Sequence, residues 1–295
     1  MKKIIGTMLC IGVLACFAFA EKINVLLCFS ENYTLQTEVL IASILSSKSP
    51  KEHLNIHCFV PNFEKSITKE LEKLVGIMDN NKSSIYFYDV PLFKHVKSKS
   101  ASYASLRLLA PKYLKNINKV IYLDIDIVVN KSLKELWDTE MSSYYFAGVI
   151  DTVKTKDNFK NEIWDKFNIY EVKDYINSGV LLINLKEIRK DIISYYKLIL
   201  SPQFLGDILP YPDQDIINKY FDKKILKISK KWNWLCYDWG KAPQDTAIFH
   251  YAGPIKPWGK FKENWHLTQD KDIDLPHADL WEKYLKMKNE ILSKK

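Results

Sequence analysis

Apolar runs and helical periodicities alternate along the first part of the chain. Short runs rich in β-branched and aromatic residues predict strands, and apolar residues that recur every three or four positions predict helices. Strands that alternate with helices through short connections are typical of a mostly parallel, doubly wound α/β sheet. The predicted strands are 23–29, 54–60, 84–90 and 119–123, and the predicted helices are 35–45, 67–78 and 101–109.

The following segments are less regular. Ser132 and Glu135 have the spacing of a capping box, which predicts a short helix that reaches Trp137. Residues 144–150 are apolar again. Residues 152–170 are polar and irregular, which is typical either of an active-site loop or of a solvated insertion.

The last third of the chain closes the predicted domain. A turn is predicted at 175–179, followed by a strand at 180–184 and an amphipathic helix at 185–200. We expect one α/β domain over residues 21–265 and a small C-terminal extension, a helical and basic tail, over 266–295.

Residues 1–20 differ from the rest. Lys2 and Lys3 precede an apolar run that ends in Ala18-Phe19-Ala20, the pattern of a secretory signal peptide. An uncleaved signal anchor is one alternative, and a cytosolic protein with an apolar N-terminal element is another. We expect a membrane-associated or exported protein, with the cytosolic face of the membrane left open.

The charge of the chain limits the kinds of partner that it can bind, and its cysteines limit the kinds of cross-link and metal site. The formal net charge is +8, but the basic residues are scattered and form no stripe with interleaved aromatic residues. This excludes nucleic acid as a favoured partner and leaves phosphate ligands and peripheral contact with an acidic membrane surface. Outside residues 1–20, Cys28, Cys58 and Cys236 show no C-x-x-C spacing, so neither a disulfide framework nor a zinc site is expected.

Two carboxylates follow the apolar strand 119–123. Asp124 and Asp126 lie two residues apart, so their side chains point to the same side of an extended chain. Buried carboxylates are costly unless paired, so this pair indicates a divalent cation; an aspartate pair in a solvated loop is the alternative. His250 also ends an apolar run, in a loop with Gly253 and Lys256, and imidazole together with carboxylates suits Mn²⁺.

Ligands of doubly wound sheets bind beyond the carboxyl ends of the strands. Asn32 follows the first predicted strand and the Asp124/Asp126 pair follows the fourth, so both are expected at one crevice. No glycine-rich phosphate loop follows any strand, which argues against a dinucleotide enzyme or a P-loop NTPase. A bound diphosphate would therefore need a metal ion and basic side chains.

Two further stretches have both a structural and a functional interpretation. Pro212 followed by Asp213, Gln214 and Asp215 is typical of a helix N-terminus, although acidic residues there can also serve a site. The aromatic cluster of Trp232, Trp234, Tyr237 and Trp239 favours core packing over a sugar-binding platform.

The order of four motifs resembles glycosyltransferase family 8, which includes bacterial lipopolysaccharide galactosyl- and glucosyltransferases and glycogenin. The resemblance runs from about residue 23 to residue 258. The motifs are Asp124-Ile125-Asp126, the segment Asn177-Ser178-Gly179-Val180-Leu181-Leu182-Ile183-Asn184, Asp213-Gln214-Asp215, and His250 followed by Gly253, Lys256, Pro257 and Trp258.

The resemblance implies a GT-A fold, with a Rossmann-like sheet, and the activity of a hexosyltransferase. It implies transfer of a hexose, glucose or galactose, from a UDP-sugar to a saccharide or lipopolysaccharide-type acceptor, with retention at the anomeric carbon and with Mn²⁺, or alternatively Mg²⁺, as cofactor. By position, Asp124, Asp126 and His250 match the family's metal ligands. Residues that match donor contacts are Asn32, Tyr33, Arg107, Asp124, Asn177, Gly253 and Lys256, and residues that match the surroundings of the donor sugar are Asp151, Asn177, Asp213 and Gln214.

The implied chemistry assigns roles to these residues. Mn²⁺ and Lys256 would neutralise the charge that develops on the departing diphosphate. Gln214 is the candidate beside the anomeric carbon, as a nucleophile or, because an amide is a poor nucleophile, as a stabiliser of same-face substitution. Asp151 and Asp213 are expected to bind sugar hydroxyls. The rival hypothesis is a catalytically inactive, transferase-like protein that holds glycans with the cluster Trp232–Trp239.

Overall fold

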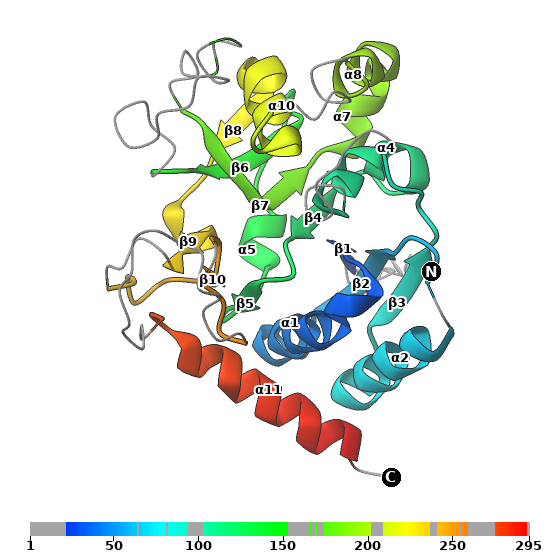
Figure 1. Ribbon diagram of the computed structural model, residues 1–295, viewed down its shortest axis with the longest axis vertical. Helices are drawn as coiled ribbons and strands as arrows, with labels where there is room; N and C mark the ends of the chain where they lie inside the picture. The colour runs from blue at the N-terminus through cyan, green and yellow to red at the C-terminus, as the bar shows by residue number, and fades with distance from the viewer. Residues whose placement is uncertain are drawn as a thin grey trace, which may run out of the picture.

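A twisted seven-stranded sheet forms the centre of the computed structural model (Figure 1). The strand order is β3-β2-β1-β4-β7-β6-β8, in which β7 alone runs antiparallel to its neighbours and the other strands pair in parallel. A smaller three-stranded sheet has the order β5-β10-β9. The expected α/β class and the mostly parallel, Rossmann-like sheet flanked by helices are confirmed.

The structure describes residues 22–63, 65–80, 82–93, 103–152, 166, 169, 174–201, 209–236, 241–253, 255–258 and 275–293. The strands are β1 (Lys22–Cys28), β2 (His53–Phe59), β3 (Ser84–Tyr88), β4 (Val120–Leu123), β5 (Ile127–Val129), β6 (Phe146–Ile150), β7 (Ile176–Ile183), β8 (Ile225–Lys227), β9 (Trp234–Leu235) and β10 (Ile248–His250). The α-helices are α1 (Thr34–Ser47), α2 (Lys65–Asp79), α4 (Ala110–Tyr113), α5 (Lys134–Trp137), α7 (Leu185–Lys190), α8 (Ile192–Ile199), α10 (Pro212–Phe221) and α11 (Ala278–Ser293), and 3-10 helices cover Glu31–Tyr33, Leu106–Leu109, Asp222–Lys224 and Lys230–Trp232.

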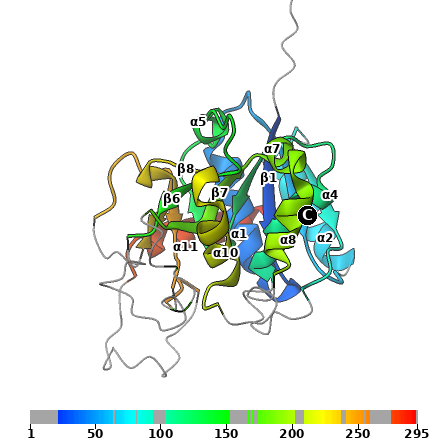
Figure 2. The same cartoon turned by 90° about the horizontal axis from the view of Figure 1, so that it is seen from above.

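Helices cover both faces of the large sheet, as Figure 2 shows from above. The side chains of each strand alternate between the faces, so β1 sends Ile23, Val25 and Leu27 to one core and Leu26 and Cys28 to the other. The first core includes residues of α1, α2 and α5, and the second includes residues of α4, α7, α8 and α10. Burial on both faces explains why these strands read as continuous apolar runs.

The carboxyl ends of β1, β2, β3 and β4 meet at one edge of the large sheet. β1 pairs in parallel with β4, with Leu27 opposite Leu123, so the 3-10 helix after β1 and the aspartates after β4 lie at the same edge. The chain then leaves the large sheet between Asp124 and Asp126 and enters β5 of the small sheet. The two sheets therefore meet at the predicted metal site.

The expected turn at 175–179 is wrong. Residues 176–183 form the single strand β7, which is buried along its whole length. Asn and Ser favour turns because their side chains hydrogen-bond to the local backbone, and Gly favours them because it adopts positive φ without steric cost. Here the polar side chains of Asn177 and Ser178 have buried tertiary partners instead, so tertiary context overrides the local preference.

Three other expectations about helices need correction. The helix expected at 185–200 is two helices, because Asp191 leaves the helical region at φ −131° and ψ 51°. The capping box of Ser132 and Glu135 is not formed. Ser132 Oγ accepts from the backbone N–H of Lys134 and donates to Glu52, and Glu135 forms an ion pair with Lys231. In the expected helix 101–109, residues 101 and 102 lie outside the described part, residues 103–105 are helical as expected, and the chain then tightens to a 3-10 helix at Leu106–Leu109 before α4.

The C-terminal helix α11 is packed against the domain. It lies alongside α1 and α2 (Figure 1), and Lys288 forms a buried ion pair of 2.7 Å with Glu38 of α1. Cys28, Cys58 and Cys236 are free and buried. Among the described residues, no helix combines the length and apolarity that a membrane span requires. Residues 1–20, most of the polar segment 152–170, and residues 266–274 of the tail lie outside the described part.

Candidate active site

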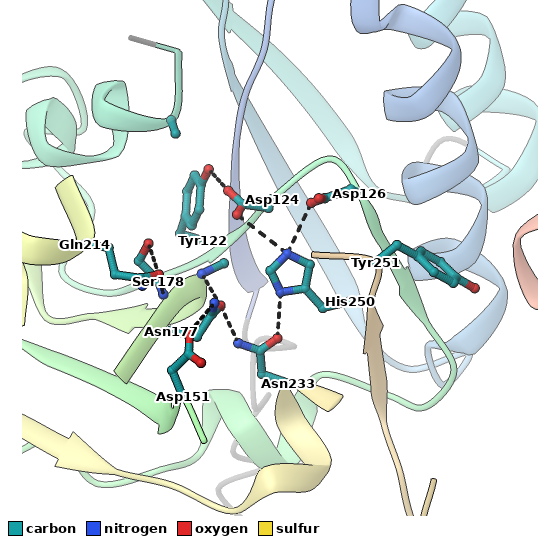
Figure 3. Close-up of polar contacts among 12 residues, drawn as sticks. Tyr122, Asp124, Asp126, Asp151, Asn177, Ser178, Gln214, Asn233, His250 and Tyr251 are labelled. Atoms are coloured by element: carbon teal, nitrogen blue, oxygen red, sulfur yellow. Dashed lines mark hydrogen bonds and ion pairs between the residues drawn. The ribbon is translucent and has the colours of Figure 1, made fainter. Parts of the chain in front are cut away.

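Asp124, Asp126 and His250 come together at the junction of the two sheets (Figure 3). Each offers one ligand atom, and these atoms all lie within 4.8 Å of one another. His250 Nε2 lies 3.2 Å from Asp126 Oδ1 and 3.8 Å from Asp124 Oδ2. Strand register explains the meeting, because His250 of β10 pairs with Ile127 of β5, directly after Asp126.

A buried arginine fixes the carboxylate of Asp124. Arg107 Nη2 donates to Asp124 Oδ1 at 3.0 Å, and the Tyr122 hydroxyl donates to the same oxygen. The guanidinium also lies 3.9 Å from the centre of the Tyr122 ring, a cation–π contact. Burial alone would lower the pKa of Arg107, but Asp124 and Tyr122, with Asp213, raise it above its ordinary value, so the arginine stays charged.

A lysine and the imidazole hold the carboxylate of Asp126. Lys256 Nζ donates to Asp126 Oδ2 at 2.5 Å and to the backbone carbonyl of Tyr251 at 2.7 Å. Burial alone would raise the pKa of Asp126, but Lys256 and then His250 hold it well below its usual range. The loop that carries Lys256 back turns at Gly253, whose φ of 92° favours glycine.

Gly179 of β7 makes room for the metal-ligand cluster. Leu123 of β4 pairs with Val180, so Gly179 lies beside Asp124, whose N–H donates to the Gly179 carbonyl at 2.8 Å. A Cβ at this position would lie 2.1 Å from Cε1 of His250 and 2.9 Å from Oδ2 of Asp124. No side chain fits there, so the glycine of the Asn-Ser-Gly motif is required for close approach rather than for a turn.

The N-terminus of α10 packs against β7 at this site. Pro212 occupies the first turn of α10 with Asp213 and Asp215, as the capping interpretation predicts. Asp213 nevertheless also belongs to the site, because its Oδ2 lies 3.3 Å from Arg107 Nε. Gln214 Oε1 accepts from the backbone N–H of Ser178 at 2.9 Å and from its hydroxyl at 3.2 Å. Burial raises the pKa of Asp213 although Arg107 acts to lower it.

Asn177 and Asp151 line the other side of the cluster. Asn177 Nδ2 donates to Asp151 Oδ2 at 3.2 Å, and both residues are buried. Asn177 and Gly179 face the same side of β7 because strand side chains alternate, whereas Ser178 faces Gln214.

Sequence reasoning missed Asn233, which lies between Asn177 and His250 with no exposed surface. Asn233 stands between Trp232 and Trp234, and the sequence there indicates only aromatic packing.

The structure brings together most of the predicted site residues. Asp124, Asp126, His250, Lys256, Arg107, Asp213, Gln214, Asn177 and Asp151 form one connected cluster, and Gly253 lies in the loop of Lys256. Asn32 and Tyr33 are exposed in the 3-10 helix after β1, at the same edge of the sheet but outside this cluster. Trp232 is buried in the first core and Trp234 in a separate apolar cluster beside the small sheet, as core packing predicts, and Tyr237 and Trp239 lie outside the described residues.

The donor set fits a divalent cation. Two carboxylates from the segment between β4 and β5 converge with an imidazole nitrogen from β10, and the pKa of Asp126 is low enough for it to stay ionised. Carboxylate and imidazole ligands suit Mn²⁺ and, with more water in the coordination shell, Mg²⁺. The same cluster carries the positive side chains Arg107 and Lys256, which suit an anionic ligand.

Comparison with known proteins decides the family. The model of glycosyl transferase family 8 matches residues 24–262. The chain belongs to glycosyltransferase family 8. A putative glycosyltransferase of Haemophilus influenzae is 30% identical over 285 residues, which cover 88% of this chain and 82% of the relative. The lipopolysaccharide 1,2-glucosyltransferase of Escherichia coli is 28% identical over 255 residues, 81% of this chain and 74% of the relative.

The fold of this family 8 enzyme is also found among solved structures. The crystal structure of galactosyltransferase LgtC, in complex with donor and acceptor sugar analogs, superposes with a TM-score of 0.70 at 21% identity. The match covers 90% of this chain and 96% of that structure. The expected GT-A fold is confirmed, and the protein is a glycosyltransferase.

Proposed function

We propose that this glycosyltransferase moves a hexose from a UDP-sugar to a saccharide acceptor, with retention and with Mn²⁺ bound by Asp124, Asp126 and His250. The convergence of these three side chains at the carboxyl end of β4 carries the proposal. Relatives named as lipopolysaccharide glucosyl- and galactosyltransferases support glucose or galactose as the sugar and a lipopolysaccharide-type acceptor.

The bound cation would supply Lewis acidity to the leaving diphosphate. Lys256, which pairs with Asp126, adds a positive charge at the site. Arg107 holds the carboxylate of Asp124 in one orientation through a hydrogen bond to Oδ1, so the position of that ligand is set before the donor arrives. Gly253 lets the loop bring Lys256 back over the site. Asn32 and Tyr33, exposed at the same edge, are proposed to receive the uridine.

Gln214 is proposed to stabilise the developing charge at the anomeric carbon. The backbone N–H of Ser178 is an unambiguous donor, so the atom that it contacts is the amide oxygen of Gln214. That oxygen also accepts from the Ser178 hydroxyl. Two donors hold the oxygen in place and reduce its electron density, which favours a stabilising role over nucleophilic attack. Asp151 and Asp213 are proposed to bind hydroxyls of the donor sugar.

The inactive, glycan-binding alternative is less well supported. Trp232 and Trp234 are 5% and 7% exposed, so neither ring offers a face on which a sugar could stack. Calorimetry with UDP and Mn²⁺ separates the two hypotheses: binding of UDP that requires the metal supports the transferase, and absence of UDP binding supports the alternative.

Hydrolysis of UDP-glucose and UDP-galactose by the purified protein tests the proposed function. We expect Mn²⁺-dependent release of UDP that EDTA abolishes, and a released hexose that has the α configuration before mutarotation. Asp124→Asn should abolish turnover. Asp138→Asn is the control, because Asp138 is an exposed carboxylate that pairs with Lys134 on α5. Turnover that persists without metal would refute the mechanism.

We also propose that residues 4–19 attach the enzyme to a membrane. Their apolar composition and Lys2-Lys3 support this, and Lys22, at the start of β1, lies at the sheet edge opposite to the site. The exposed Lys22, Lys115 and Lys186 suit contact with anionic lipid at that edge. Fractionation of source cells tests the attachment: recovery with the membrane supports it, and a soluble chain that begins at Glu21 contradicts it.

A further inference from the structure

Two buried asparagines link the backbone of β7 to the imidazole of His250 (Figure 3). Gly179 N–H donates to Asn177 Oδ1 at 2.9 Å, and Asn233 Nδ2 donates to the same oxygen at 2.9 Å. The other end of the Asn233 amide, Oδ1, lies 2.9 Å from His250 Nδ1. Asn177, Asn233 and His250 are at most 7% exposed, so water does not compete for these contacts.

The direction of every hydrogen bond in this series follows from its first member. A backbone N–H can only donate, so the Asn177 atom that it contacts is the oxygen, and Asn177 Nδ2 then faces the carboxylate of Asp151 at 3.2 Å. The Asn233 atom that faces Asn177 Oδ1 must donate, so it is Nδ2. The Asn233 atom that faces His250 is therefore the oxygen, and His250 Nδ1 must carry the proton.

We propose that Asn233, anchored by Asn177, is a positioning residue that holds His250 in the Nδ1–H tautomer and so directs the lone pair of Nε2 at the metal site. Nε2 is the nitrogen that lies 3.2 Å from Asp126 and 3.8 Å from Asp124. Only the nitrogen without a proton can bind a cation, and the partner of the other nitrogen decides which one that is. The importance of this tautomer for catalysis rests on the proposed metal-dependent function, but the tautomer itself does not.

Removal of the Asn233 side chain should lower the Mn²⁺ affinity although all three metal ligands stay in place. Groups that orient a metal-bound histidine typically contribute 10- to 100-fold to metal affinity. We expect Asn233→Ala to weaken Mn²⁺ binding by about that factor, measured by electron paramagnetic resonance of free Mn²⁺. Asn233→Asp keeps an oxygen that accepts from Nδ1–H, so it should retain most of the affinity. Asn55→Ala is the control, because Asn55 is a half-buried, hydrogen-bonded asparagine on β2, away from the site.

The tautomer itself is read from the imidazole ¹⁵N shifts of the metal-free protein, with the His250 signals assigned by their loss in His250→Gln. The wild type and Asn233→Asp should show a protonated Nδ1, and Asn233→Ala should show Nε2–H or a mixture. A wild type whose Nδ1 carries no proton, or an Asn233→Ala variant that keeps both the Nδ1–H signal and wild-type Mn²⁺ affinity, would overturn the inference.

The metal-free measurement separates this inference from the proposed function. A wild type with Nδ1–H and no turnover of UDP-sugars would contradict the function and leave the role of Asn233 intact. Turnover with a tautomer that does not depend on Asn233 would do the reverse. If Asn233→Ala fails to fold, Asn177→Leu removes the anchor of Asn233 and takes its place in the same two measurements.

Discussion

The two oxygens of Asp124 have different partners, because Arg107 binds only one of them. Oδ1 accepts from Arg107 at 3.0 Å, and Oδ2 faces His250 Nε2 at 3.8 Å. The Arg107 side chain is 1% exposed and the Asp124 side chain is 25% exposed. The carboxylate is therefore anchored to the interior through one oxygen and open to a ligand through the other.

Removal of the arginine should destabilise the fold as well as the site. Arg107→Met leaves Asp124 and Asp213 without their shared cation, and breaking a buried ion pair in this way costs about 3–5 kcal/mol. Urea unfolding measures the loss. Arg189→Met is the matched control, because Arg189 donates to backbone carbonyls of Ile117 and Leu114 and its loss leaves no carboxylate unpaired. Equal losses in the two variants would contradict the role of the ion pairs.

A single methyl group on β7 should disrupt the metal-ligand cluster. Gly179→Ala places a Cβ 2.1 Å from His250 Cε1, so the imidazole must move away from the aspartates. We expect at least a 10-fold weaker Mn²⁺ affinity, measured by calorimetry, since displaced ligands lose the geometry that the cation requires. In the control Gly148→Ala the nearest atom is Cδ1 of Ile176, a flexible side chain away from the cluster, so Mn²⁺ affinity should be unchanged.

A buried histidine remote from the site should make stability depend on pH. Burial lowers the pKa of His57 to about 4, below the value of about 6.5 expected in the unfolded chain. Between these two values the unfolded state binds more protons, so the free energy of unfolding falls as the pH is lowered from 6.5 towards 4 and levels off below that.

The size of this pH effect is up to about 3 kcal/mol, from the difference of the two pKa values. Urea unfolding of the wild type and of His57→Gln across this range measures it, and the variant should show a flatter profile. His53→Gln, on the same strand, is the control and should keep the wild-type slope. Parallel profiles for the wild type and His57→Gln would show that His57 is not the group responsible.

The C-terminal helix should contribute to stability through one ion pair. Lys288→Met leaves Glu38 buried at 3% exposure without a cation, a change expected to cost about 3 kcal/mol. Thermal or urea unfolding measures it, and Lys286→Met, at an exposed position of the same helix, should stay within about 0.5 kcal/mol of the wild type. A loss for Lys286→Met as large as that for Lys288→Met would mean that the buried pair contributes nothing specific.

Much of the fold could be predicted because most strands carry their own signal. The strands β1, β2, β3 and β4 are short runs rich in apolar residues, and α2 has an apolar face with a helical period, although α1 is buried on all sides over residues 36–45. β7 was predicted too short, because Asn177, Ser178 and Gly179 favour a turn unless distant side chains satisfy them. The small sheet was not predicted, since β5, β9 and β10 have only two or three residues each.

The site could be predicted as far as its residues belong to recognisable motifs. Asp124, Asp126 and His250 stand at the ends of apolar runs, so both chemistry and position indicated them. Asn233 could not be found in this way, because its importance lies in the two residues that its amide joins, which are 56 and 17 positions away in the sequence. Such a contact exists only once the small sheet has formed.

The crossing of the chain from one sheet to the other has a thermodynamic consequence. Asp124 extends the large sheet, whereas His250 belongs to the small one, so a cation that binds both also fastens the two sheets together. Ligand binding to the folded state alone adds about 2.7 kcal/mol to stability at a hundred times the dissociation constant. Melting temperature should therefore rise with Mn²⁺ concentration and report metal affinity without any sugar present, and Asp124→Asn should melt at a temperature that Mn²⁺ leaves unchanged.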